Sequence, residues 1–183
     1  MVMRIGIDIS QTAYEGTGVA NLLSKLVGYL LRADKKNEYV LFFSSLRRNF
    51  QFSSRFNRDN FQSNHNLKIK RFRLPPILLD LLWNRLHILP IEWLIGDVDI
   101  FITSDWTEPP TIRAKKVTIL YDLIVYKYPK ETGKKIVETQ KRKLKWVKKE
   151  SKMILCISEA TKKDAMEILC IEENRLKVIR PGI

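Results

Sequence analysis

Residues 3–8 read Met-Arg-Ile-Gly-Ile-Asp, and residues 16–33 read GTGVANLLSKLVGYLLRA. The first stretch is a short, nearly continuous apolar run, which is typical of a parallel strand buried on both faces. The second carries apolar residues at the 3.6-residue spacing of an amphipathic helix. A buried strand followed by a glycine-containing loop and a helix indicates an α/β fold built on a parallel sheet.

The same alternation of short apolar runs and longer helical patterns continues along the chain. Strands are expected at residues 3–8, 39–43, 67–71, 100–103, 117–120, 153–157 and 176–179. Helices are expected at residues 18–33, 76–95 with a break at Pro90, 131–149 and 158–169. Residues 47–66 are polar and poorly periodic, which indicates a loop or a short irregular helix. The pattern predicts one Rossmann-like domain over residues 1–183, with helices on both faces of a parallel sheet.

Composition narrows the classes of function. The chain has 183 residues, a size that fits one domain, and a net charge of +13, which predicts an anionic partner such as nucleic acid, membrane lipid or a phosphorylated substrate. Residues 77–95 are apolar, but Asp80, Arg85 and Glu92 interrupt them, so no membrane span is expected. The first residues lack the apolar stretch of a secretory signal, and Cys156 and Cys170 stand alone. These features predict a reducing, cytoplasmic location.

The loop Gly16-Thr17-Gly18 lies between the first strand and the first helix. Glycines allow close approach to a ligand, and a helix start offers free amides to a phosphate. Asn21 occupies the place of the third glycine of a GxGxxG motif, so the motif is incomplete. The loop therefore has two interpretations: a phosphate-binding loop, or a flexible turn that begins a helix.

Two further strand ends carry polar residues. Tyr121 and Asp122 follow strand 117–120, and ligands bind at the carboxyl ends of parallel strands. Asp122 could act as a base, accept a bond from a hydroxyl, or cap the next turn. Ser158 and Glu159 follow strand 153–157, where they can line a cleft, or simply cap a helix and complement its dipole.

Residues 130–152 contain ten cations against three glutamates, with Trp146 among them. This basic helix is either a solvated surface or a face for an anionic membrane, and cations at 68–73 beside the apolar stretch 74–82 strengthen the second interpretation. His65 and His87 are isolated and interpreted as structural, so no metal site is expected. The cations expected to face a membrane are Lys141, Arg142, Lys145 and Lys148.

Four stretches, taken in order, resemble the amino-terminal domain of GT4-type retaining glycosyltransferases, which have the GT-B architecture. They are residues 3–8 with the loop and helix from Gly16, residues 97–106, residues 117–129 and residues 154–183. The last two are the more specific, and together the four cover nearly the whole chain. The chain departs from the family at Tyr121, where a histidine is usual, and at Arg180, where a small or apolar residue is common.

The resemblance implies two Rossmann-like domains facing each other across a cleft. The amino-terminal domain binds the acceptor, and the carboxyl-terminal domain binds most of the nucleotide-sugar. Gly16, Thr17 and Gly18 would lie near the donor diphosphate, and Tyr121 with Asp122 would line the acceptor side. Ser158, Glu159, Pro181 and Gly182 would form the crossing between the domains. The family needs no metal and no cofactor beyond the nucleotide-diphosphate sugar that serves as donor.

The leading hypothesis is transfer of a sugar to a carbohydrate or lipid-linked acceptor, by a protein lying peripherally at the inner face of the membrane. Because strand 176–179 runs into Pro181-Gly182 with no element after it, the carboxyl-terminal domain is expected in cis or in trans, and these residues alone are expected to be inactive. A rival hypothesis is a non-catalytic basic module that binds anionic membrane or nucleic acid. Nucleic acid is disfavoured because no recognisable nucleic-acid motif is found. Another GT-B enzyme, such as a sugar-nucleotide epimerase, is a third possibility.

Overall fold

The computed structural model describes residues 1–48 and 66–180. The loop or irregular helix expected at 47–66 lies almost entirely outside the described residues, as do Pro181 and Gly182.

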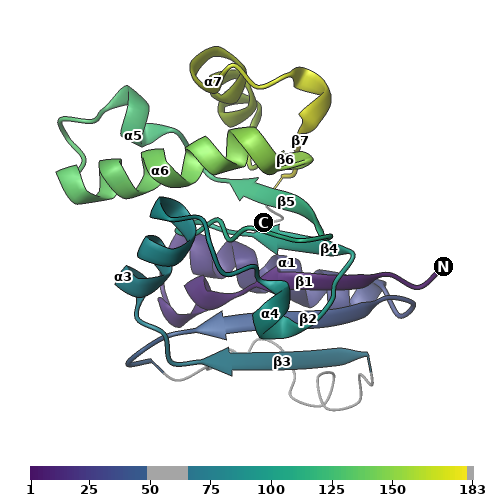
Figure 1. The fold of residues 1–183 in the computed structure, drawn as a ribbon. Helices are drawn as coiled ribbons and strands as arrows, with labels where there is room; N and C mark the ends of the chain where they lie inside the picture. Colours follow the sequence, from purple (N-terminus) through teal and green to yellow (C-terminus); the bar gives the residue numbers. More distant parts are fainter. Residues whose placement is uncertain (49–65, 181–183) are drawn as a thin grey trace.

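Within the described residues, seven strands form a single parallel sheet in the order β3-β2-β1-β4-β5-β6-β7 (Figure 1). The sheet confirms the predicted Rossmann-like α/β fold. Strands β1 to β3 are added in one direction and β4 to β7 in the other, so the strand order reverses between β1 and β4. The strands are β1 (Arg4–Asp8), β2 (Glu38–Ser44), β3 (Leu67–Phe72), β4 (Ile100–Thr103), β5 (Lys115–Leu120), β6 (Met153–Cys156) and β7 (Leu176–Val178).

Helices lie on both faces of the sheet. Helix α1 (Gly18–Ala33) packs on one face against side chains of β1, β2 and β5, including Ile7, Leu41 and Ile119. Helices α6 (Lys134–Glu150) and α7 (Glu159–Leu169) pack on the other face against Leu120 and Ile154. The short segments are η1 (Ser10–Ala13), α3 (Pro76–Leu79), η2 (Asp80–Arg85), α4 (Glu92–Ile95), α5 (Ile124–Lys127) and η3 (Glu173–Arg175).

Helix starts follow local capping chemistry. The Thr17 hydroxyl accepts a hydrogen bond from the Ala20 amide at 3.2 Å and begins α1 at Gly18, as predicted. The Ser158 hydroxyl accepts from the Thr161 amide at 3.1 Å, which confirms the predicted cap of α7. Helix α6 begins at Lys134 rather than at residue 131, because the chain turns at Gly133 and Thr132 bonds back to the Tyr128 carbonyl.

The segment from residue 76 to residue 95 differs from the expected helix with a break at Pro90. It contains α3, the π-helical segment η2 and, after a break, α4, so the continuous helical run that begins at Pro76 already ends at Arg85. His87 and Leu89 have left-handed backbone, with φ of 53° and 67°. The reversal brings the Leu89 carbonyl to 2.9 Å from the indole nitrogen of Trp83, which is fully buried. The buried N–H needs an acceptor, and this chain reversal supplies one.

A third group of buried side chains fills the space between the segment 76–98 and strands β2 and β4; it includes Phe42, Trp83, Ile91 and Phe101. In the described ranges no helix combines the length and the apolar character that crossing a membrane requires.

Candidate functional site

The candidate site lies where β1, β4, β5 and β6 end, at the edge that contains the reversal of strand order. In an open parallel sheet this is the position where ligands bind. The residues that follow these strands are Ile9, Ser104, Tyr121 and Ile157. The sequence-predicted residues Gly16–Gly18, Tyr121, Asp122, Ser158 and Glu159 all follow strands at this edge.

Tyr121 is 9% exposed and links the end of β5 to its neighbours. Its hydroxyl lies 3.1 Å from the Ser104 hydroxyl, and its carbonyl accepts a 3.0 Å bond from the Thr161 hydroxyl. Burial raises the pKa of Tyr121 to about 12. The side chain is therefore a neutral hydrogen-bonding group near pH 7 and not a base.

Asp122 is exposed beside Tyr121. One carboxylate oxygen accepts a 3.0 Å bond from the Ile124 amide, so the residue caps the turn before α5. Its charge also contributes to the raised pKa of Asp105, although burial is the larger cause. The turn-capping interpretation of Asp122 is thus present in the structure, and Asp122 and Asp105 interact electrostatically across the ends of β4 and β5.

A buried cation lies beneath this edge. Lys143 of α6 is 2% exposed, and its ammonium group donates a hydrogen bond to the Ser104 carbonyl. Burial lowers the pKa of Lys143, whereas the charges of Glu108, Asp105 and Asp8 raise it. Burial also raises the pKa of Asp8, whose carboxylate accepts a 2.9 Å bond from the Ser10 amide. The buried Lys143 and Asp8 and the partly buried Asp105 form the charge cluster of the site.

Sequence analysis counted Lys143 among the cations of the basic helix, and both of its interpretations of that helix place them at the surface; for Lys143 this is wrong, because the residue is buried. A usable signal was present, because Lys143 lies four residues before Val147, next to the buried stripe of α6. The sequence analysis predicted no site role for Asp8, which ends the first strand, or for Asp105, which lies in residues 97–106.

The Gly16–Gly18 loop is open to solvent. Gly16 has a φ of +83°, which only glycine adopts readily, and a Cβ at Gly16 or Gly18 would meet nothing within 4 Å. The Arg48 guanidinium lies against this region: it donates a 2.9 Å bond to the Ala13 carbonyl and sits 4.8 Å from the centre of the Tyr14 ring. Sequence analysis did not single out Arg48, which the fold brings to the loop from the end of β2.

The remaining predicted residues fall in different places. Ser158 is the helix cap already described, and Glu159 is exposed in the first turn of α7. Lys141, Lys145 and Lys148 are exposed on α6. Arg142 is instead partly buried and pairs with Asp80 at 2.9 Å.

A second buried polar group supports the site from below. Glu108 is fully buried and accepts hydrogen bonds from Thr103 at 2.7 Å, Thr118 at 3.1 Å and Ser151 at 3.3 Å. Lys116 lies 3.6 Å from Glu108 and 2.6 Å from Glu150. We call Glu108, its three hydroxyl donors and Lys116 the Glu108 network. It joins β4 and β5 to Ser151, the residue that directly follows α6.

His87 occupies a structural position, whereas His65 lies outside the described residues. The His87 ring stacks on Trp146 with a centroid distance of 3.5 Å, and its Nε2 atom lies 2.9 Å from Glu150. Over residues 1–48 and 66–180, no group of three or more His, Cys, Asp or Glu side chains is arranged to hold a metal ion.

Comparison of the chain with known proteins found no matching family model and no matching curated protein.

Proposed function

We propose that this chain is the acceptor-side, amino-terminal half of a GT-B glycosyltransferase that moves a sugar from a nucleotide-diphosphate donor to a carbohydrate or lipid-linked acceptor. The observation that carries the proposal is the set of polar groups at one edge of the sheet, around the reversal of strand order: the Gly16–Gly18 loop, Tyr121 with Asp122, and Ser158. The four stretches that resemble the GT4 family contain these groups in the same order along the chain.

The proposed donor side is the Gly16–Gly18 loop with Arg48. Sugar transfer leaves a nucleoside diphosphate that gains negative charge as the bond to the sugar breaks. Backbone amides at a helix start and a nearby guanidinium stabilise such charge without a metal. The open backbone of the loop and the placement of Arg48 against Ala13 and Tyr14 support this assignment.

The proposed acceptor side is formed by Tyr121 and Asp122. Tyr121 stays protonated near pH 7, since burial raises its pKa to about 12, so its role is to hydrogen-bond and position. Asp122 is exposed, and a carboxylate there can accept a hydrogen bond from a sugar hydroxyl. In place of the usual histidine, Tyr121 makes this side less basic than in the family that the chain resembles.

Most donor contacts in that family come from the second domain. We therefore propose that the chain works with a carboxyl-terminal domain in cis or in trans, and we expect the 183 residues alone to show no sugar transfer. Substantial sugar transfer by these residues alone would contradict the proposal that a carboxyl-terminal domain is required.

A binding experiment tests the donor side directly. The thermal stability of the chain is measured with UDP, with GDP and with inorganic pyrophosphate, for the native chain and for Arg48→Gln. The matched control is Arg32→Gln, because Arg32 also lies over a tyrosine ring, that of Tyr29 at 4.6 Å, but at the far end of α1. We expect stabilisation by at least one of these diphosphates that weakens in Arg48→Gln and persists in Arg32→Gln. No stabilisation by any of them, or equal loss in both variants, would refute the donor-side assignment.

The net charge of +13 and the exposed lysines of α6 favour a second candidate, a basic module that binds polyanions without catalysis. Salt-dependent binding of DNA or RNA at physiological ionic strength, together with no nucleoside diphosphate binding, would favour this candidate over the first. The cytoplasmic location and a peripheral place at the inner membrane face remain part of the first proposal.

A further inference from the structure

The segment from α3 to α4 exposes large apolar side chains to solvent. We call Ile77, Leu81, Leu86, Ile88 and Trp93 the apolar ridge; their exposed fractions are 72%, 42%, 56%, 51% and 68%. Ile112, 58% exposed, is tied to the same segment, because its amide donates a 2.8 Å bond to the Glu92 carboxylate. The five ridge residues lie within 17 residues of one another. They therefore form a cluster, unlike the single exposed apolar residues that are normal on a protein surface.

The ridge belongs to a segment with a well-packed inner side. Leu79, Trp83 and Ile91 are buried there, with exposed fractions of 5%, 0% and 0%. The segment is also fixed to α6, since the Trp146 indole donates a 2.9 Å bond to the Asn84 carbonyl and His87 stacks on Trp146. The ridge is thus the outer surface of a firmly anchored segment.

The two carboxylates of the segment make hydrogen bonds within the protein. Asp80 accepts hydrogen bonds from Asn84, Arg85 and Arg142. Glu92 is 6% exposed, and one of its oxygens accepts bonds from three consecutive amides, those of residues 112–114. Both carboxylates of segment 76–95 are therefore engaged within the protein.

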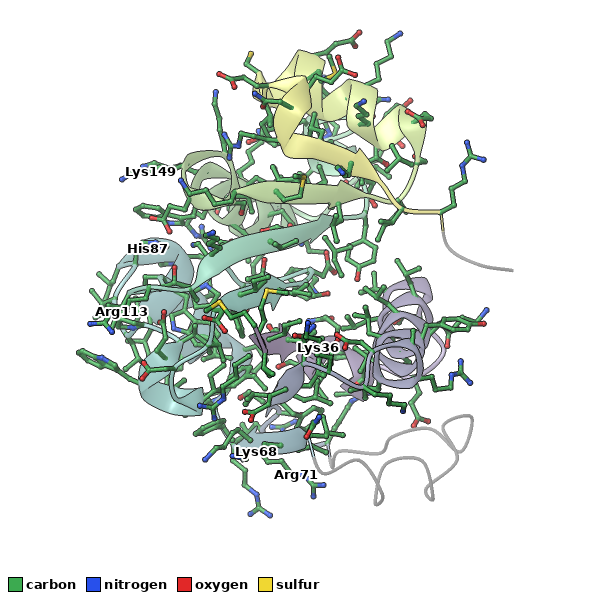
Figure 2. The ribbon with its side chains drawn as sticks, turned by 90° about the vertical axis from the view of Figure 1, so that its right-hand side faces the viewer. Lys36, Lys68, Arg71, His87, Arg113 and Lys149 are labelled. Atoms are coloured by element: carbon green, nitrogen blue, oxygen red, sulfur yellow. The ribbon has the colours of Figure 1, made fainter. Side chains whose placement is uncertain are left out.

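Four cations lie beside residues of the ridge or of the segment that carries it. Arg113 follows Ile112, Arg85 lies within the segment, and Lys145 and Lys149 lie over the Trp146 ring at 5.6 and 5.1 Å. Figure 2 shows His87, Arg113 and Lys149 along the same side of the molecule, which is also the side of the segment 76–95. All four of these cations are exposed, and Arg85 also pairs with Asp80 at 3.2 Å.

We propose that the apolar ridge docks on the surface of an anionic lipid bilayer. The ridge side chains enter the boundary between headgroups and acyl chains, Trp93 lies at this interface, and the surrounding cations face lipid phosphates. Apolar side chains framed by Lys and Arg are the signature of interfacial binding. A second copy of the chain fits less well, because a symmetric contact would bring the same cations against one another.

The proposal narrows which surface is expected to meet the membrane. Sequence analysis assigned that role to Lys141, Arg142, Lys145 and Lys148 of α6, with support from the cations at 68–73 beside the apolar stretch 74–82. In the structure Arg142 pairs with Asp80 and Lys141 lies 5.0 Å from the centre of the Tyr126 ring. Among those four residues, Lys145 lies on Trp146 and therefore flanks the ridge. Docking by the ridge does not require the proposed sugar transfer.

Vesicle sedimentation tests the proposal. The native chain is mixed with vesicles of phosphatidylcholine alone, or of phosphatidylcholine with phosphatidylglycerol, and the bound fraction is measured. The test variant is Ile77→Ser with Trp93→Ser. The matched control is Tyr29→Ser with Met166→Ser, because Tyr29 and Met166 are 58% and 39% exposed on α1 and α7. Far-UV circular dichroism and a thermal melt establish that each variant is folded.

We expect binding to the vesicles that contain phosphatidylglycerol, a partition coefficient roughly tenfold lower in the ridge variant, and no change in the control. Equal binding by the ridge and control variants, or no binding to anionic vesicles, would overturn the proposal. Self-association in sedimentation velocity that the ridge variant abolishes would assign the ridge to a second copy instead. Since no nucleotide is present, the outcome is independent of the diphosphate binding experiment.

Discussion

Replacement of Glu108 perturbs the Glu108 network at its centre. Its carboxylate receives hydrogen bonds from one hydroxyl of β4, one of β5 and that of Ser151, and Lys116 lies 3.6 Å away. We consider two variants: Glu108→Ala, which removes the carboxylate, and Glu108→Gln, which keeps its shape and one oxygen acceptor.

The loss in free energy of unfolding depends on which buried groups around Glu108 keep a hydrogen-bond partner. Removing one member of a buried ion pair costs about 3–5 kcal/mol. Lys116 retains the Pro109 carbonyl at 3.0 Å and Glu150 at 2.6 Å, and Thr118 retains Ser151 at 2.7 Å. We therefore expect the lower end, about 3 kcal/mol, for Glu108→Ala. Glu108→Gln keeps most of the packing and part of the hydrogen bonding, so about 1–2 kcal/mol is expected.

The assays are urea denaturation, monitored by tryptophan fluorescence and far-UV circular dichroism, and a thermal melt. At this chain length 1 kcal/mol corresponds to a shift of about 2–4 °C in Tm, so Glu108→Ala should melt about 6–12 °C lower than the native chain. Glu131→Ala is the control, because Glu131 is exposed before α6. A Glu108→Ala chain within about 1 kcal/mol of the native free energy of unfolding would refute the stabilising role of the network.

Three further predictions concern single positions. Neither Gly16→Ala nor Gly18→Ala creates a clash. Gly16→Ala should nevertheless destabilise the chain by about 1 kcal/mol in urea denaturation, because Gly16 has a φ of +83°, whereas Gly18→Ala should not, because Gly18 has no positive φ. Hydrogen bonds, chiefly from Tyr39, lower the pKa of Asp34 to about 2, below its value of 3.8 when unperturbed; its contribution is therefore present above pH 4 and lost as the pH falls towards 2. The stability difference between the native chain and Asp34→Asn should shrink over that acid range, and a constant difference would contradict this origin. Lys143→Met should destabilise the chain, and this loss should shrink as the pH falls through the range where Asp8 and Asp105 become protonated, because burial raises the pKa of both carboxyls and Lys143 compensates their charge. A loss that stays constant as the pH falls would count against the cluster.

The parts of the fold that sequence could predict are those with local causes. Strand positions follow from short apolar runs, and the apolar spacing after the glycine loop predicts α1 at its observed bounds. Ser158 was also identified as a helix cap. Parallel strands then bring Tyr121, Asp122 and the glycine loop to one edge, so the location of the candidate site was also predictable.

The parts that sequence missed depend on contacts between distant residues. Lys143 looks like any other lysine of a basic helix, and only the packing of α6 on the sheet shows that it is buried. Arg48 approaches the glycine loop because β2 ends beside β1. The reversal at His87 and Leu89 arises because the Trp83 indole needs an acceptor, which is a tertiary requirement.

The central place of β1 also has a consequence for how the chain assembles. One edge of β1 pairs with β2, which is complete by residue 44, but its other edge pairs with β4, which begins at residue 100. During synthesis the first half of the sheet can form while the second edge of β1 still has unpaired amides and carbonyls. An unpaired edge is a template for strands of other chains. Aggregation of the nascent protein should therefore be most acute before β4 emerges and should decline once it has paired.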